Sequence, residues 1–127
     1  MKNLVFLLFT ALLVFASCKK DDDCNETNLS NVIVGTWDVV ALITLGTVEF
    51  QADGDLIDDS GVFVSDTVNG VVVTEKRYEV ESNTNINIIA ETSAGQFEYD
   101  VNVTSFDCDD IDITVPSIGI SGSLRRD

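Results

Sequence analysis

Residues 33–45 read IVGTWDVVALITL, and apolar and polar side chains alternate along this stretch. One phase holds Ile33, Gly35, Trp37, Val39, Ala41, Ile43 and Leu45, whereas the other holds Thr36, Asp38 and Thr44. A period of two residues is typical of a β-strand that buries one face. We therefore expect one long strand here, bent because of its length, and a second strand after Gly46 that includes Val48 to Phe50.

The alternation continues toward the C-terminus in short segments separated by turn sequences. Asp53-Gly54 is expected to lead to a third strand that ends near Val64, and Asn69-Gly70 is typical of a two-residue hairpin turn. Further strands are expected over residues 71–80, 86–91, 97–104, 111–115 and 118–124. Beyond residue 17, no stretch of twelve residues has the spacing of an amphipathic helix.

These segments predict an all-β domain of about eight antiparallel strands with short turns. Such a chain forms either a sandwich or a closed barrel. We favour an up-and-down barrel, because closure leaves no strand edge exposed to other chains.

The N-terminus has the layout of an export signal. Lys2 precedes an apolar run from Leu4 to Phe15, and the small residues Ala16 and Ser17 precede Cys18. The run is too short to span a bilayer, which takes about 20 apolar residues. We expect cleavage after residue 17 and a lipid on the Cys18 thiol. An ordinary secretory signal, cut at another bond, is the alternative.

This interpretation divides the chain into a signal peptide over residues 1–17, a lipidated, charged tether over 18–31 and a folded domain over 32–127. The residues before Cys18 resemble the lipobox of bacterial lipoproteins, with Phe15 in place of the usual leucine. The charged run over residues 19–23 resembles the surface-export signal of some Gram-negative groups. These resemblances imply an outer-membrane lipoprotein exposed at the cell surface, with a periplasm-facing tether as the alternative.

The chain is strongly acidic, with 22 Asp and Glu residues against seven Lys and Arg residues. Without residues 1–17, which contain Lys2, six basic residues remain and the formal net charge is −16. Nucleic acid is not an expected partner, because phosphate binding needs a basic face.

The three cysteines can be divided between two roles. If Cys18 carries the lipid, Cys24 and Cys108 remain as a pair in an oxidising compartment, where a disulfide is expected. It would join the end of the tether to the far end of the domain. A metal site would need more ligands, and a redox pair would have C-x-x-C spacing.

Two short stretches resemble a known family. Residues 34–39, with Gly35-Thr36-Trp37, resemble the start of the lipocalin-like (calycin-type) barrels, and residues 48–54 resemble a hairpin of the small lipocalin-like domains in bacterial lipoproteins. In the larger lipocalins the tryptophan plugs one end of the barrel and an arginine of the last strand lies across it. The resemblance therefore implies that Gly35, Trp37 and Arg126 close one end. A frayed, solvated C-terminus is the alternative for Arg126.

The short strands also bear on ligand binding. A barrel of about eight strands encloses a space that side chains nearly fill. Any pocket is therefore expected to be small and to lie at the open mouth of the barrel.

No set of side chains has the pattern of a catalytic site, and we expect neither an enzyme nor a cofactor. The chain contains no histidine, so a serine or cysteine nucleophile would lack its usual base. Two acidic clusters are candidate calcium sites: Asp53, Asp55, Asp58 and Asp59, and Asp107, Asp109, Asp110 and Asp112. In the first, Ile57 stands where an EF-hand loop has an oxygen ligand, so both clusters are interpreted as solvated turns and strand faces.

Three functions fit these observations. The leading hypothesis is a lipid-anchored binding protein whose ligand is a small apolar molecule or an envelope component. An alternative is an inhibitor of a lysozyme or protease, because an acidic surface steers basic enzymes toward it. A structural envelope lipoprotein is the third.

Overall fold

The computed structural model describes residue 24 and residues 26–126. Cys18 and the expected signal peptide lie outside the described residues. Within the described part, the regular structure consists of nine β-strands and one short helix. No helix of that part is long and apolar enough to cross a membrane.

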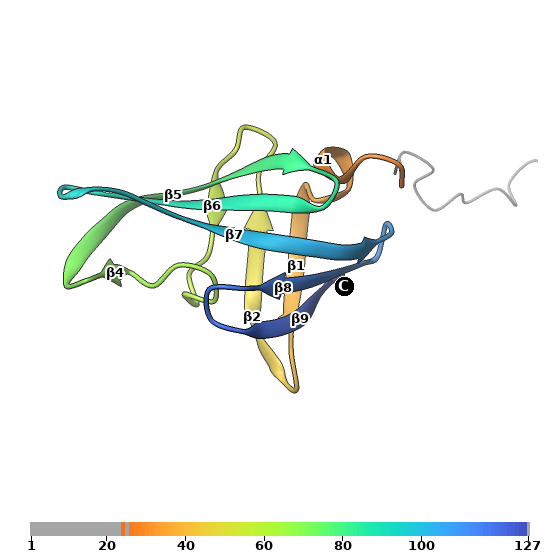
Figure 1. Cartoon of the computed structure of the whole chain (residues 1–127). Coiled ribbons are helices and arrows are strands. Elements are labelled where there is room, and N and C mark those ends of the chain that lie inside the picture. The colour runs from red at the N-terminus through yellow and green to blue at the C-terminus, as the bar shows by residue number, and fades with distance from the viewer. Residues whose placement is uncertain (1–23, 25, 127) are drawn as a thin grey trace, which may run out of the picture.

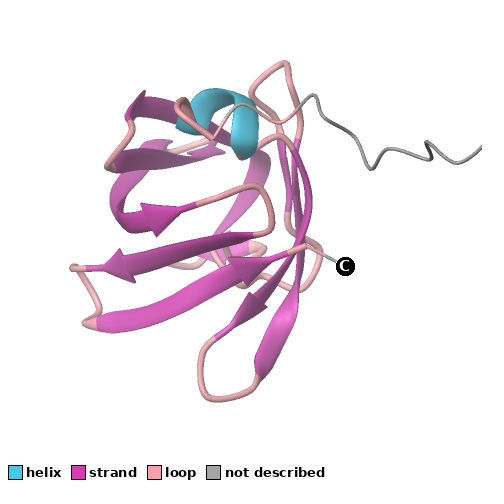
Figure 2. Ribbon diagram, turned by 90° about the vertical axis from the view of Figure 1, so that its right-hand side faces the viewer, coloured by secondary structure: helices cyan, strands magenta, loops and turns pink. Residues whose placement is uncertain are grey.

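The nine strands form one antiparallel sheet that curls into a half-barrel (Figures 1 and 2). They are β1 (Gly35–Val40), β2 (Thr44–Phe50), β3 (Leu56–Ile57), β4 (Thr67–Val68), β5 (Val71–Ser82), β6 (Asn85–Thr92), β7 (Gly95–Phe106), β8 (Asp110–Val115) and β9 (Ile120–Arg125). The strand order is β3-β2-β1-β9-β8-β7-β6-β5-β4. Sequence neighbours therefore pair throughout, except β3 with β4, and the first long strand pairs with the last.

The prediction of an all-β fold of antiparallel, up-and-down strands is confirmed, whereas the sheet forms a half-barrel rather than the expected closed barrel and has nine strands rather than about eight. The hydrogen-bonded ladder is open between the short edge strands β3 and β4, which loop 58–66 connects. Near that opening, Asp55 forms an isolated bridge with Arg77. The Tyr78 N–H also donates to the Gly54 carbonyl at 2.9 Å. These contacts join the two sides of the curled sheet at one end.

The expected long first strand is wrong, because the chain reverses in its middle. β1 ends at Val40 and β2 begins at Thr44, and the Ala41 N–H donates to the Ile43 carbonyl at 3.0 Å. Leu42, at the tip of this hairpin, is fully exposed. The turn contains none of the Gly, Pro, Asn or Asp residues that mark most turns. Because the apolar phase of the alternation continues through Ala41 and Ile43, the sequence predicts one continuous strand.

The third strand was also predicted too long. β3 covers two residues, Leu56–Ile57, and the chain then leaves the sheet in loop 58–66. By contrast, the Asn69-Gly70 hairpin is confirmed between β4 and β5, with φ of 51° at Asn69 and 79° at Gly70. Positive φ at both residues is the requirement of a type I′ turn.

A short helix, α1 (Leu29–Val32), covers one end of the half-barrel (Figure 1). Leu29 and Val32 are fully buried, although Leu29 falls within the range assigned to the tether. The Asn83 side chain, in the β5–β6 turn, accepts from the Leu29 N–H and donates to the Thr27 carbonyl, both at 3.0 Å. The folded part therefore includes residues before position 32.

The core lies on the concave side of the sheet. Its largest fully buried side chains are Trp37, Phe50, Leu29, Ile33, Ile86, Ile88, Ile111 and Leu124. Tyr78 packs edge-on against Phe50 with ring centroids 4.9 Å apart. Phe63, Phe97 and Tyr99 are only partly buried and lie around the cavities described below.

Candidate functional site

One end of the half-barrel is closed around Trp37. The indole is fully buried, and its Nε1–H donates to the Ile33 carbonyl at 2.7 Å. The guanidinium carbon of Arg126 lies 4.2 Å from the centre of the indole ring. A cation at this distance from an indole face is attracted by the negative potential of the ring.

Arg126 also donates hydrogen bonds to three carbonyl oxygens. Nε donates to Cys108 at 2.8 Å, and Nη2 donates to Val32 at 2.6 Å and to Val34 at 3.3 Å. Gly35 makes room for this side chain, because a Cβ there would lie 2.6 Å from Nη1 of Arg126. Gly35 also has a φ of +128°, which favours glycine. The structure thus brings Gly35, Trp37 and Arg126 together.

The expected disulfide is present at the same end. Cys24 and Cys108 are bonded, with their Cα atoms 6.0 Å apart. Because Arg126 donates to the Cys108 carbonyl, the N-terminal segment, the β7–β8 turn and the last strand meet at this closed end.

Neither of the two aspartate clusters considered for calcium is arranged as a set of metal ligands. Among the described residues, no group of three or more Asp, Glu, Cys or His side chains is placed to hold a metal ion. The Asp53 carboxylate accepts from the Asp55 N–H at 3.0 Å, which is a local turn contact. Asp58 is buried and has a different role.

The Asp58 carboxylate organises loop 58–66. It accepts backbone N–H bonds from Val62 and Phe63 at 2.8 Å and from Val64 at 2.7 Å. The Asp58 carbonyl accepts from Lys76 Nζ on β5 at 2.6 Å. In the sequence, Asp58 and Asp59 look alike in the same polar turn, so their spacing did not reveal this role.

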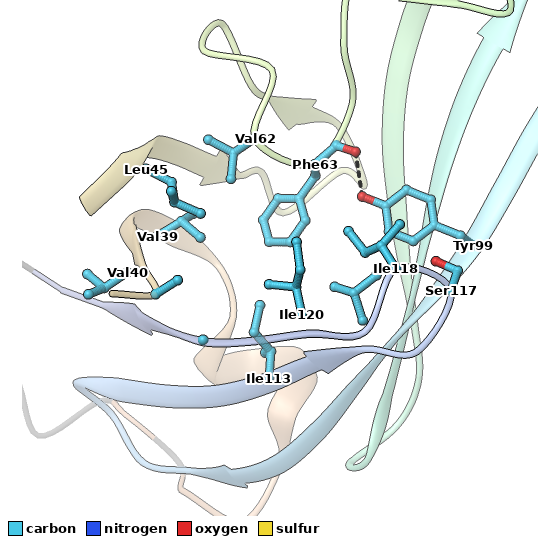
Figure 3. Close-up of a pocket in the computed structure, with 13 residues that line it drawn as sticks. Val39, Val40, Leu45, Val62, Phe63, Tyr99, Ile113, Ser117, Ile118 and Ile120 are labelled. Atoms are coloured by element: carbon cyan, nitrogen blue, oxygen red, sulfur yellow. Dashed lines mark hydrogen bonds between the residues drawn. The ribbon is translucent and has the colours of Figure 1, made fainter. Parts of the chain in front are cut away.

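The opposite, open end of the half-barrel holds a cavity of about 240 Å³ (Figure 3). A small pocket at the open mouth is what the short strands predict. Its walls come from the β1–β2 hairpin, loop 58–66, β7 and the β8–β9 hairpin. The lining residues are Val39, Val40, Ala41, Leu45, Val62, Phe63, Tyr99, Ile113, Val115, Ser117, Ile118, Ile120 and Gly122.

Tyr99 and Ser117 supply the polar side-chain groups of this lining. The Tyr99 hydroxyl donates to the Phe63 carbonyl, which attaches β7 to loop 58–66 (Figure 3). Burial, followed by the negative charge of Asp58, raises the pKa of the Tyr99 phenol above its ordinary value. Tyr99 is therefore neutral at physiological pH and serves as a hydrogen-bond donor.

Phe63 and Tyr99 also line a second cavity, of about 280 Å³. That cavity extends toward Val68, Ala90 and Phe97. The two aromatic residues therefore belong to the lining of both cavities.

Exposed apolar side chains surround the first cavity. Leu42 and Ile43 project from the β1–β2 hairpin with exposed fractions of 102% and 70%, and Ile118 projects from the β8–β9 hairpin with 65%. Residues 39–48 and 113–124, which build these two hairpins, contain no charged side chain. In a chain with 22 acidic residues, these two hairpins thus form an uncharged part of the rim.

Comparison with known protein families, curated proteins and solved structures finds no match to this chain.

Proposed function

We propose that this protein is a lipid-anchored binding protein of the outer membrane, with a lipocalin-like barrel that holds a small apolar molecule at its open end. The observation that carries the proposal is the 240 Å³ cavity between the β1–β2 and β8–β9 hairpins. A concave, mostly apolar site with a few polar groups is typical of small-molecule binding.

The lipocalin-like part of the proposal is supported by the strand arrangement and by the closed end. Sequence-adjacent strands pair, β1 pairs with β9, and a cation lies over a buried tryptophan near the start of β1. The cation over the tryptophan is the feature that the resemblance of residues 34–39 implies.

The proposed anchor fits the position of the cavity. Cys24 is bonded to Cys108 at the closed end, so a lipid on nearby Cys18 would hold the protein by that end. The open end would then face away from the membrane that carries the lipid. Replacing Cys18 by Ser in the full chain should abolish labelling by radioactive palmitate and release the protein from the membrane fraction, whereas unchanged labelling would exclude this anchor.

Binding can be tested with N-phenyl-1-naphthylamine, a neutral apolar dye that becomes fluorescent in apolar sites. The wild-type protein is expected to bind it saturably. Ala41→Trp should abolish most of the signal, because Ala41 lines the cavity and an indole would fill its mouth. Leu42→Trp is the matched control, because Leu42 lies on the same hairpin but is fully exposed. A wild-type protein that does not bind, or equal binding by both variants, would contradict the proposal.

A second candidate function is supported by the β1–β2 hairpin itself. Its exposed Leu42 and Ile43 could enter a cleft of a partner protein, and a formal net charge of −15 would steer a basic enzyme toward it. This inhibitor hypothesis predicts salt-dependent inhibition of a basic lysozyme that Leu42→Asp weakens. The absence of inhibition at low salt would argue against it.

A further inference from the structure

We infer that the open-end cavity selects an uncharged chain, such as a long-chain alcohol or ester, and rejects the carboxylate of a fatty acid. This inference rests on the proposed binding function and adds the chemical class of the ligand.

The first observation is the absence of charge from the cavity lining. None of its residues is ionisable at neutral pH, because Tyr99 is kept neutral and the others are apolar or, at Ser117, a hydroxyl. The Tyr99 hydroxyl is already bonded to the Phe63 carbonyl. Ser117 lies at the edge of the cavity on the β8–β9 turn (Figure 3). A neutral hydroxyl or ester can bond there, whereas an anion would lose hydration without gaining a counter-ion.

The second observation is where the cations of the described chain lie. The described Lys and Arg residues are Lys76, Arg77, Arg125 and Arg126, and none of them lines the cavity. Lys76 contacts Asp58 and Asp66, and Arg77 pairs with Glu91. Arg125 pairs with Asp110, and Arg126 covers Trp37 at the opposite end. A carboxylate head group therefore finds no partner at the open end within the described part of the chain.

The third observation is the overall charge. The formal net charge of −15 creates a negative potential around the molecule, which lowers the local concentration of anions. The hairpins over residues 39–48 and 113–124 carry no charge, so they do not offset this negative potential. Both the long-range field and the local lining thus disfavour an anionic ligand.

The test compares 1-decanol, methyl decanoate and decanoate as competitors of N-phenyl-1-naphthylamine at neutral pH. A chain that starts at residue 19 is suitable, because both cysteines of the disulfide and every core residue lie within it. We expect the alcohol and the ester to displace the dye with similar affinity. Decanoate should bind at least about tenfold more weakly, because its carboxylate would lose part of its hydration at the mouth without gaining a counter-ion, and the acidic chain repels it.

A gain-of-function variant makes the test independent of solubility differences among the competitors. Ser117→Lys places a cation at the mouth on an exposed turn, where the fold tolerates it, and should bring decanoate to within about threefold of decanol. Ser117→Gln is the matched control, similar in size but uncharged, and should keep the preference for decanol.

The outcomes separate the two proposals. If wild-type protein binds decanol and decanoate equally, or if the Lys variant gains no more decanoate binding than the Gln variant, the ligand class is wrong while the binding function stands. If neither the dye nor any competitor binds, the proposed function itself fails.

Discussion

The Arg126 side chain connects three segments of the fold. Its guanidinium contacts the Trp37 ring and donates to carbonyl oxygens of Val32, Val34 and Cys108. These oxygens belong to α1, the strand entry and the β7–β8 turn. The alternative of a frayed, solvated terminus is therefore wrong for this residue, whereas the neighbouring Arg125 is mostly exposed.

Replacing Arg126 by Ala should lower the free energy of unfolding by about 2–3 kcal/mol, because partly buried carbonyl oxygens lose their donors and the indole loses its cation. Chemical denaturation followed by Trp37 fluorescence would measure it. Arg125→Ala is the control and should change stability by less than about 0.5 kcal/mol, because its ion pair with Asp110 is exposed. Equal effects of the two variants would contradict this role of Arg126.

Asp107 is a second residue whose local contacts have a measurable consequence. Its Oδ1 accepts the backbone N–H bonds of Asp109 and Asp110, both at 2.8 Å, and these bonds hold the pKa of the Asp107 carboxyl below its ordinary value. The folded pKa is thus lower than the unfolded one. The ionised carboxylate therefore stabilises the fold above the unfolded pKa, and this contribution disappears as pH falls through the folded pKa.

We predict that Asp107→Asn melts at a lower temperature than the wild type at neutral pH, and that the difference shrinks as pH falls through the lowered pKa of Asp107. Thermal unfolding at a series of pH values measures this directly. Asp109→Asn serves as the control, because the Asp109 side chain accepts neither of these two bonds. A difference that stays constant with pH would rule out the proposed role of the Asp107 charge.

At the scale of elements, loop 58–66 replaces a strand that the alternation of apolar residues predicted. The loop occupies the opening between β3 and β4 and forms one wall of the cavity. Its shape depends on Asp58, which is 1% exposed and binds three consecutive backbone N–H groups. A buried carboxylate with this many donors satisfies backbone groups that a strand would otherwise satisfy by pairing.

Asp58→Ala should destabilise the protein by roughly 3 kcal/mol, because it leaves these N–H groups without an acceptor. It should also weaken dye binding, since Phe63 would no longer be held against the cavity. Denaturation and dye titration on the same preparation measure both effects. Asp59→Ala, a change at the exposed neighbour, should alter neither. Wild-type affinity in Asp58→Ala would show that the loop does not shape the site.

At the scale of the whole molecule, the two ends of the described chain meet. β1 pairs with β9, and the disulfide joins residues 84 positions apart at the same end as α1 and Trp37. Closing one end in this way leaves the other end free to present the cavity. The molecule thus has a cross-linked end and an opposite end where two uncharged hairpins border the cavity.

The double change Cys24→Ser and Cys108→Ser should reduce the free energy of unfolding by about 4 kcal/mol, because a long disulfide loop restricts the unfolded chain. Denaturant titration of the chain from residue 19 would measure this. Wild-type protein with a reducing agent should show the same loss, and Cys24→Ser alone should match the double variant. A loss below about 1 kcal/mol would mean that the cross-link contributes little to folding.

The sequence alone determined the β character, the antiparallel order from β5 to β9 and the Asn69-Gly70 turn. Side-chain alternation and turn preference are local properties, because each depends only on residues that are close together in the sequence. The pairing of Cys24 with Cys108 also followed from their number and the expected compartment. The contact of Arg126 with Trp37 was implied by resemblance, and the structure places the two side chains together.

The tertiary structure decided the reversal at residues 41–43, the course of loop 58–66, helix α1 and the cavity. Each depends on groups that are distant in sequence, such as Asn83 with Leu29, Lys76 with Asp58 and Tyr99 with Phe63. A local pattern contains no information about these partners. Their hydrogen bonds exist only because the curled sheet brings the segments within reach of one another.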